Sequence, residues 1–293
     1  MKKPNFLIVG ASKSGTTSLA SYLNNSDNVF ISKVKEPRYF INDIIHSIND
    51  SDPIKKHILK TSIFDYETYL NLFAETKKKI VGEASVHYLY HYKTVIPKIK
   101  EKLGDIKIII CLRNPIQRTT SNIKYLKMHH KNDINIELFN EKKYIGKNYN
   151  SFWFYTKQSM YYNQVKGYKD SFSDVLVITQ ENLRDKTIDT LNEVYDFLNT
   201  SRVKRLNKLN LNSSLKENNF YKKFKKTLFF KLLKSLTKKF LRKSIKTIFK
   251  KYIYTRDKSK LSIENRRYLA KLFIKDIKKT EKLLSTKLWV NDF

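Results

Sequence analysis

The 293-residue chain is short of cysteine, glycine and proline, and each shortage excludes something. The single cysteine, Cys111, excludes a disulfide framework; within the apolar run 106–112 it is predicted to be a small buried side chain on a strand. With six glycines, five prolines, no Gly/Ser linker and no internal repeat, we expect one domain over residues 1–293. No Cys/His cluster supports a structural metal site.

Long hydrophobic runs are missing as well. No apolar stretch approaches the length of a transmembrane helix. The first strand-like run begins at residue 5, which leaves no room for a signal peptide before it. We therefore expect a cytoplasmic protein, with peripheral contact at the inner membrane face as a further possibility.

Acidic side chains are also few compared with basic ones. Lys and Arg number 59 against 27 Asp and Glu, for a net charge of +32. Such a charge attracts nucleic acid, acidic glycans, anionic lipid or a nucleotide, although compositional bias explains part of it equally well. Segment 220–251 has no acidic residue, and its apolar spacing predicts one or two basic amphipathic helices. These helices either pack on the domain or dock on a membrane surface or an acidic polymer.

The apolar runs that are present alternate with segments of helical periodicity. This alternation predicts an α/β fold, a parallel sheet with helices on both faces, followed by a basic helical C-terminal region. The expected strands are 5–9, 79–82, 106–112 and 174–178, and the expected helices are 16–24, 115–128, 156–171 and 187–198, with a long helical region after 219.

A glycine-bounded loop follows the first expected strand. Gly10 ends the strand, Gly15 follows five positions later, and Thr16 and Thr17 open a helix. Backbone N–H groups and the helix dipole at such a junction favour a phosphate. The nucleotide-binding Walker A pattern requires Lys directly after the second glycine, followed by Ser or Thr. Here the lysine, Lys13, lies inside the loop, so the loop is P-loop-like but poorly suited to a magnesium-bound triphosphate.

A second motif follows the third expected strand. The strand ends at Arg113, Pro115 stands near a helix start, and Ser121 falls about two turns into that helix. Ligands of open parallel sheets bind beyond the carboxyl ends of the strands. The planar guanidinium of Arg113 suits a second phosphate better than a lysine would.

These two motifs together resemble those of sulfotransferases that use 3′-phosphoadenosine 5′-phosphosulfate (PAPS). Further segments resemble elements of the glycan-type and bacterial members, which extends the likeness toward both ends of the chain: 34–40, 82–88, 159–165, 175–183 and 260–289. Val86 replaces an expected proline, and no clear Lys-Gly-Arg or Arg-Lys-Gly loop occurs late in the chain.

The resemblance implies a role for particular residues. The 5′-phosphosulfate is expected on the first loop and the 3′-phosphate on the second motif, with a tyrosine nearby. The expected donor-binding residues are Ser12, Lys13, Ser14, Gly15, Thr16, Thr17, Arg113, Ser121 and Tyr161. A sulfuryl group carries less charge than a phosphoryl group, so no metal is expected.

Three residues are the catalytic candidates. Lys13 is expected to stabilise charge on the leaving phosphate. Glu36, by resemblance, is expected to take a proton from the acceptor, with His87 as the alternative base. If Glu36 had no such role, it would be a surface carboxylate paired with Lys33 or Lys35.

The sequence does not decide the acceptor, and it leaves two other functions as alternatives. The Lys-Glu-Pro element of residues 35–37 favours a carbohydrate or glycolipid acceptor with a hydroxyl or amine, and no specific nucleic acid is expected. One rival is a nucleotide kinase or NTPase, and the other a non-enzymatic protein that binds polyanions or membranes. The i, i+4 pair His87 and His91 lacks the Glu of a zinc protease.

Overall fold

The computed structural model describes residues 2–129, 141–202, 215–217, 254–256 and 261–289. Contacts divide the chain into two compact units, one of residues 1–209 with 261–293 and one of residues 210–260. The second is described only by the strands β6 (Leu215–Glu217) and β7 (Tyr254–Arg256), which pair antiparallel. The predicted basic helices of 220–251 lie outside the described residues, and the single domain over 1–293 stays a prediction.

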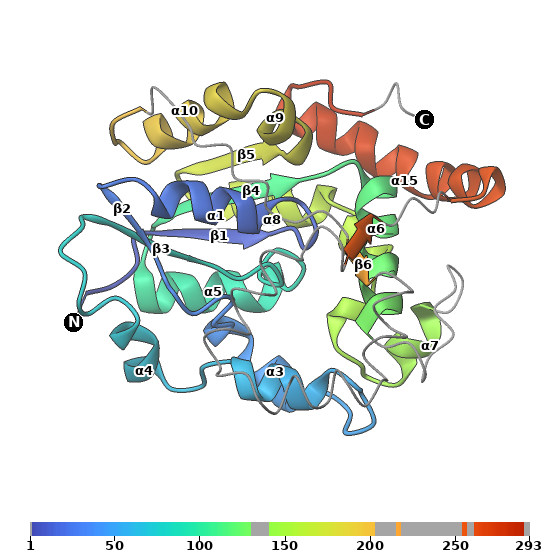
Figure 1. Ribbon diagram of the computed structural model, residues 1–293, viewed down its shortest axis with the longest axis horizontal. Coiled ribbons are helices and arrows are strands. Elements are labelled where there is room, and N and C mark those ends of the chain that lie inside the picture. The colour runs from blue at the N-terminus through green and yellow to red at the C-terminus, as the bar shows by residue number, and fades with distance from the viewer. Residues whose placement is uncertain (1, 130–140, 203–214, 218–253, 257–260, 290–293) are drawn as a thin grey trace, which may run out of the picture. The chain divides into compact units, whose positions relative to one another are not determined.

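The first unit is built on a five-stranded parallel sheet (Figure 1). Its strands lie in the order β2, β3, β1, β4, β5, so the sheet grows to both sides of β1. Their bounds are β1 Phe6–Gly10, β2 Val29–Ile31, β3 Ile80–Ala84, β4 Lys107–Leu112 and β5 Val175–Thr179. Four of them were expected from the apolar runs; the three-residue edge strand β2 was not.

The central strands are apolar throughout because both faces of the sheet are buried. In β1, Leu7 and Val9 face one hydrophobic core and Phe6 and Ile8 face the other. Figure 1 shows the helices on both sides of the sheet, which confirms the α/β prediction. The longer helices are α1 Thr16–Asn24, α5 Tyr92–Leu103, α6 Pro115–His129, α8 Tyr162–Ser171, α10 Thr187–Phe197 and α15 Ile263–Leu284.

Shorter helices fill the connections. They are the α-helices α2 Asn42–His46, α3 Lys55–Thr61, α4 Tyr66–Asn71, α7 Glu141–Gly146 and α9 Gln180–Asp185, and the 3₁₀ turns η1 Tyr39–Ile41, η2 Ser151–Trp153 and η3 Lys157–Ser159. The helix expected over 156–171 was wrong at its start. After η3 the backbone turns extended at Met160, and α8 begins only at Tyr162.

The C-terminal helix α15 is fixed to α8 by a carboxylate. Asp276 accepts hydrogen bonds from the amides of Tyr161, at 2.6 Å, and Tyr162, at 3.3 Å. These amides open α8, so Asp276 satisfies two donors that no carbonyl within the helix can reach. Trp289, beyond α15, packs against Tyr161 with 6.0 Å between the ring centroids.

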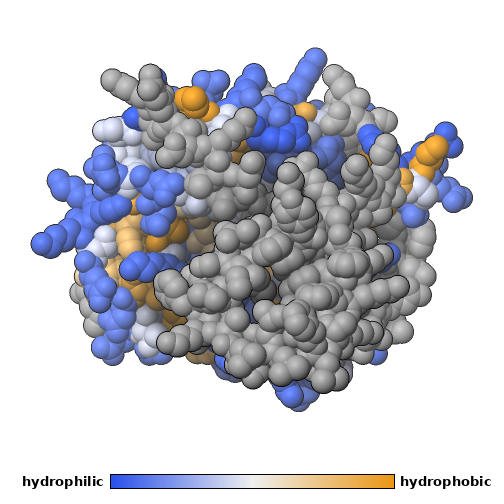
Figure 2. Space-filling view, viewed as in Figure 1, coloured by the Kyte–Doolittle hydropathy of each residue, from blue (hydrophilic) through white to orange (hydrophobic). Residues whose placement is uncertain are grey.

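The described surface is mainly hydrophilic, with hydrophobic areas between the polar side chains on the face shown in Figure 2. Four large hydrophobic side chains are exposed in the described ranges: Val34, Ile188, Ile263 and Tyr268. Within those ranges, no helix combines the length and the apolar character that crossing a bilayer requires.

Candidate active site

The candidate site lies beyond the carboxyl ends of β1, β3 and β4. Strand order reverses at β1, with β3 on one side and β4 on the other, and such a switch point is where open parallel sheets bind ligands. The connections that leave these strands are 11–15, 85–91 and 113–114. The amide of Leu89 donates to Val9 O at 2.7 Å, which ties the second connection to the end of β1.

The loop after β1 presents a row of free backbone donors. Lys13 and Gly15 have left-handed φ angles of 67° and 87°, and α1 begins directly after Gly15. Among the described residues, none accepts a hydrogen bond from the amides of residues 12–17. A helix start and a turn of this kind both aim such amides at a bound anion. The loop therefore has the donors that a phosphate site requires.

Two arginines fix the carbonyls of this loop. Arg113 Nη1 donates to Lys13 O at 3.2 Å, and Arg118 Nε donates to Ser12 O at 2.9 Å. In a trans peptide the N–H points opposite to the carbonyl. The two arginines thus hold the next amides, those of Lys13 and Ser14, on the other side of the loop.

Arg118 itself is a fully buried cation in the first turns of α6. Its other hydrogen bonds run to neutral acceptors: Tyr155 O at 2.7 Å, Ser159 Oγ at 3.0 Å and Gln158 Oε1 at 2.7 Å. Burial lowers its pKa to about 10. A buried charge without a directly bonded counter-charge is costly, so an anion in the adjacent loop would stabilise it. Arg118 was not among the residues expected to bind the donor, although it stands five positions after Arg113.

The hydroxyl groups expected to bind the donor surround the loop. Ser14 Oγ is buried and has no partner among the described residues. The other predicted hydroxyls also lack a hydrogen-bond partner within the described ranges: Ser12, Thr16, Thr17 and, in the second turn of α6, Ser121. An unpaired buried hydroxyl costs free energy unless a ligand satisfies it, so Ser14 Oγ fits a phosphate ester.

Lys13 lies between the loop and an aromatic ring. Its Nζ is 4.4 Å from the ring centroid of Tyr125, on α6. Burial, followed by the charges of Lys35, Arg113 and Arg118, lowers the pKa of Lys13 to about 8, while Glu36 acts in the opposite direction. A bound phosphate would restore the charged form of Lys13.

Tyr161, expected near the donor, is fully buried at the start of α8. Its hydroxyl donates to Arg113 O at 2.8 Å, so it supports the arginine that holds the loop. Burial raises the pKa of this phenol.

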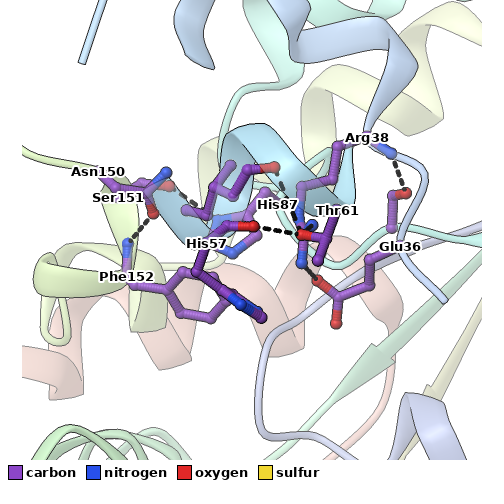
Figure 3. Close-up of polar contacts among 10 residues, drawn as sticks. Glu36, Arg38, His57, Thr61, His87, Asn150, Ser151 and Phe152 are labelled. Carbon is purple, nitrogen blue, oxygen red and sulfur yellow. Dashed lines mark hydrogen bonds and ion pairs between the residues drawn. The ribbon is translucent and has the colours of Figure 1, made fainter. Parts of the chain in front are cut away.

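Glu36 is buried in an ion pair rather than exposed on the surface (Figure 3). Its Oε2 lies 2.7 Å from Arg38 Nη2, so its partner is Arg38 and neither Lys33 nor Lys35. Arg38 Nη1 also donates to Thr61 Oγ1 at 3.1 Å, which fixes the guanidinium. The same ion pair orients the Glu36 carboxylate and leaves Oε1 without a hydrogen bond to any described residue.

His87 belongs to a buried cluster centred on Ser151, which Figure 3 shows beside it. His87 Nδ1 lies 2.8 Å from Ser151 Oγ, and His91 Nε2 lies 3.0 Å from the same oxygen. Burial, then the charges of Arg38, His91 and Arg118, holds the pKa of His87 well below its usual value; burial lowers that of His91 to about 4. His87 is therefore a neutral ring with a weak affinity for protons, and its Nε2 has no partner among the described residues.

The described residues contain no group of three His, Cys, Asp or Glu side chains placed to hold a metal ion. The i, i+4 histidines face a serine hydroxyl instead. The predicted residues thus divide into a loop with Arg113 and Ser121, and a neighbouring group with Glu36 and His87.

Comparisons with known proteins bear on this arrangement. The family model described as "Sulfotransferase domain" matches residues 3–280. The membrane-associated sulfotransferase kil1 of Dictyostelium discoideum is 31% identical over 122 residues, which are 42% of this chain. That match covers only 23% of the length of the relative.

Solved structures are similar over a larger part of the chain. A sulfotransferase from Alicyclobacillus acidocaldarius is 25% identical with a TM-score of 0.73, and the match covers 98% of each chain. The sulfotransferase domain of the curacin biosynthetic pathway is 16% identical with a TM-score of 0.47, and the match covers 70% of this chain and 77% of that one.

Proposed function

Because this chain belongs to the sulfotransferase domain family, we propose that it catalyses sulfuryl transfer and that its donor is PAPS. The residues of the first loop, 12–17, would hold the 5′-phosphosulfate. Arg113 and Ser121 would hold the 3′-phosphate, and Tyr161 would fix the backbone of Arg113 through its hydrogen bond to Arg113 O. A single sulfotransferase domain over residues 1–293 is part of this proposal.

One observation carries the donor assignment: the amides of residues 12–17 have no acceptor among the described residues, and two arginines fix the carbonyls of Ser12 and Lys13. This arrangement concentrates donors and positive charge without a Lys-Ser/Thr pair for magnesium. It fits an anion that needs no metal, and no metal is part of the proposal. As a nucleotide kinase or NTPase, the chain would lack the Walker A lysine, because Thr16 stands directly after Gly15 where that lysine is required.

PAPS supplies an activated sulfuryl group whose transfer leaves negative charge on a phosphate. Lys13 would stabilise that charge, because it belongs to the loop; its pKa is about 8 in the free protein, and a phosphate bound nearby would favour its charged form. Preorganised charge of this kind is a large contribution to catalysis. The positive charges of Arg113 and Arg118 act on the same loop.

Glu36 would accept the proton of the acceptor hydroxyl or amine. Its Oε1 accepts no hydrogen bond from a described residue, its Oε2 is held by Arg38, and its charge acts on Lys13. His87 is the weaker candidate, because burial depresses its proton affinity and Ser151 engages its Nδ1. We therefore assign the base to Glu36 and keep His87 as the alternative.

For the acceptor we propose a carbohydrate or glycolipid, on the resemblance of residues 34–40 to the glycan-type enzymes. Peripheral contact with a membrane is proposed for the basic segment 220–251, supported by its charge and by the membrane-associated relative. A polyanion-binding protein without activity is the competing function. It predicts binding that weakens steeply with salt and has no nucleotide preference.

The donor assignment is tested by thermal shift with adenosine 3′,5′-bisphosphate (PAP) against ATP plus magnesium. We expect PAP to stabilise the protein and ATP to do so weakly, because a ligand stabilises the state that binds it. Arg113→Ala should lose the PAP shift, and Arg202→Ala, an exposed arginine paired with Asp196, should keep it. Stabilisation by ATP plus magnesium alone would favour the kinase.

The acceptor is tested by mass spectrometry after incubation with radiolabelled PAPS and a panel of glycans, glycolipids and simple alcohols. A labelled glycan or glycolipid supports the assignment. Label found only on a simple alcohol contradicts it without affecting the donor.

A further inference from the structure

An acidic side chain that the proposed reaction does not use lies in the middle of the sheet. Glu83, on β3, is fully buried, and neither of its oxygens has a hydrogen-bond partner among the described residues. The charge of an ionised Glu83 would act on three tyrosines that are buried as well: Tyr69 of α4, Tyr168 of α8, and Tyr88, which follows β3. Burying an ionised carboxylate costs several kcal/mol, so a carboxyl in this place is stable as the uncharged acid.

The charged groups that face Glu83 belong to the segment that carries the proposed base. Glu36 disfavours ionisation of Glu83, and Arg38 favours it to a lesser degree. Arg38 is already engaged by Glu36 at 2.7 Å, so it does not neutralise a second carboxylate. Burial is the main reason that the pKa of Glu83 rises to about 8.

Two hydroxyl groups close to Glu83 accept hydrogen bonds from this segment. The amide of Arg38 donates to Ser85 Oγ at 3.1 Å, and the amide of Phe40 donates to Tyr88 Oη at 3.3 Å. Both hydroxyls also act on Glu83 and lower its pKa. A hydroxyl that accepts an amide proton still has its own proton to donate. The carboxyl of Glu83 is the acceptor toward which both can turn.

We propose that Glu83 is a positioning residue for Glu36: as the uncharged acid it orients the Ser85 and Tyr88 hydroxyls that hold residues 36–40 in place. An ionised Glu83 must be hydrated, and water reaches it when residues 36–40 move away from the Ser85 and Tyr88 hydroxyls, a movement that we call opening of the segment. The proton on Glu83 therefore favours the closed segment, in which both hydroxyls hold residues 36–40. The functional half of the inference rests on the proposed role of Glu36; the structural half does not.

The sign of the pH dependence follows from linkage. Glu83 titrates near 8 in the closed segment and near its ordinary value, about 4.5, once exposed. Opening therefore becomes easier as pH rises from about 5 to 8, by up to about tenfold per pH unit, and then levels off.

Hydrogen exchange on the free full-length protein measures this opening. In wild type, we expect protection factors of the Arg38 and Phe40 amides to fall up to about tenfold per pH unit between pH 5 and 8. In Glu83→Gln, which is uncharged and of the same shape, protection should not vary with pH. Glu67→Gln removes an exposed carboxylate of α4 and should behave like wild type. The same slope in Glu83→Gln and wild type would overturn the proposal.

Kinetics test the functional half. Glu83→Ala should lower kcat on the order of 10²-fold by displacing Glu36, with the Kd for PAP unchanged, and Glu83→Gln should restore most of kcat. Equal losses in kcat and in PAP affinity would refute a positioning role for the acceptor side. Should Glu83→Ala fail to fold, Glu83→Gln and exchange still decide the structural half. Should no sulfuryl transfer be measurable, the proposed function fails while the exchange result stands.

Discussion

The two halves of the site solve opposite electrostatic problems. The donor half, residues 11–17 with Arg113 and Arg118, has unpaired hydrogen-bond donors and buried positive charge. The acceptor half, residues 36–40 and 83–91 with Ser151, has an unpaired buried carboxyl on Glu83, an unpaired ring nitrogen on His87 and the unpaired Nε of Arg38 among the described residues. Lys13 lies at the boundary, where Arg113 and Arg118 lower its pKa and Glu36 raises it.

Different groups make the two halves rigid. In the donor half, arginines satisfy the loop carbonyls, so the free groups are aligned before an anion arrives. In the acceptor half, the Ser85 and Tyr88 hydroxyls accept hydrogen bonds from two backbone amides, and both hydroxyls lie close to the buried carboxyl of Glu83. An anion completes the first half, whereas the second depends on the protonation of its own side chains. Variants that affect one half and spare the other test this division.

The largest effect is expected in the acceptor half. Glu36→Gln keeps the shape of the side chain but removes the proton acceptor, so kcat should fall roughly 10²–10⁴-fold. The Kd for PAP should stay near that of wild type, because the donor half is untouched. Steady-state kinetics and calorimetry give the two numbers. His87→Gln should retain most activity; collapse of His87→Gln beside an active Glu36→Gln would transfer the role of base to His87.

A smaller effect is expected from Arg118 in the donor half. Arg118→Met removes the donor to Ser12 O and a buried positive charge. A hydrogen bond from a charged group contributes about 1.5–3 kcal/mol, so PAP should bind roughly 10- to 100-fold more weakly. Arg202→Met, which removes an exposed arginine paired with Asp196, is the matched control. Unchanged PAP affinity in a folded Arg118→Met would mean that the arginine supports only α6 and its neighbours.

The pH dependence of donor binding separates Lys13 from the arginines. Its pKa of about 8 means that Lys13 loses its charge as pH rises through 8 in the free protein. Binding of an anion favours the charged form, so PAP affinity should be highest below pH 8 and fall up to about tenfold per unit above it. Calorimetry in buffers of different ionisation enthalpy should detect proton uptake. Lys13→Met should bind more weakly with a flatter pH profile, and an unaltered profile would exclude Lys13 as the titrating group.

The loop of the donor half is easier to recognise in the sequence than the contacts of the acceptor half, for a physical reason. The loop around Lys13 and Gly15 is a local structure between one strand and one helix, and the apolar runs fix four of the five strands. Arg113 comes at the end of such a run, where the topology of a parallel sheet places ligands. The periodicity of apolar residues and the residue types of a turn can both be recognised within a short stretch of sequence.

The missed features depend on contacts between distant residues. Ser151 meets His87 across 64 positions, and Ser85 meets the Arg38 amide across 47. The edge strand β2 has three residues, too few for a periodic signal. Glu83 did leave a signal: it is an acidic residue at the end of an apolar run expected to be buried on both faces. Arg118 left one too, since it stands in the same motif as Arg113 and Ser121.

The smallest effects come from two tyrosines that form a matched pair across the division. Both are fully buried and lie on or beside α8, and each hydroxyl donates to a backbone carbonyl. Tyr161 donates to Arg113 O at 2.8 Å, in the donor half, and Tyr168 donates to Tyr88 O at 3.0 Å, in the acceptor half. Each bond contributes about 0.5–1.5 kcal/mol, so each Tyr→Phe change should shift one parameter by a few-fold.

The pair distinguishes two separate supports from one common scaffold. Tyr161→Phe should weaken PAP binding and leave the KM for the acceptor unchanged, because only the arginine of the donor half loses its support. Tyr168→Phe should leave PAP binding unchanged and lower kcat with the acceptor, because Tyr88 holds the segment that carries Glu36. Since both changes remove one buried hydroxyl from the same helix, their costs in folding stability should be similar. Equal effects of the two variants on PAP binding would show that α8 supports the site as a whole, and the division into halves would then fail.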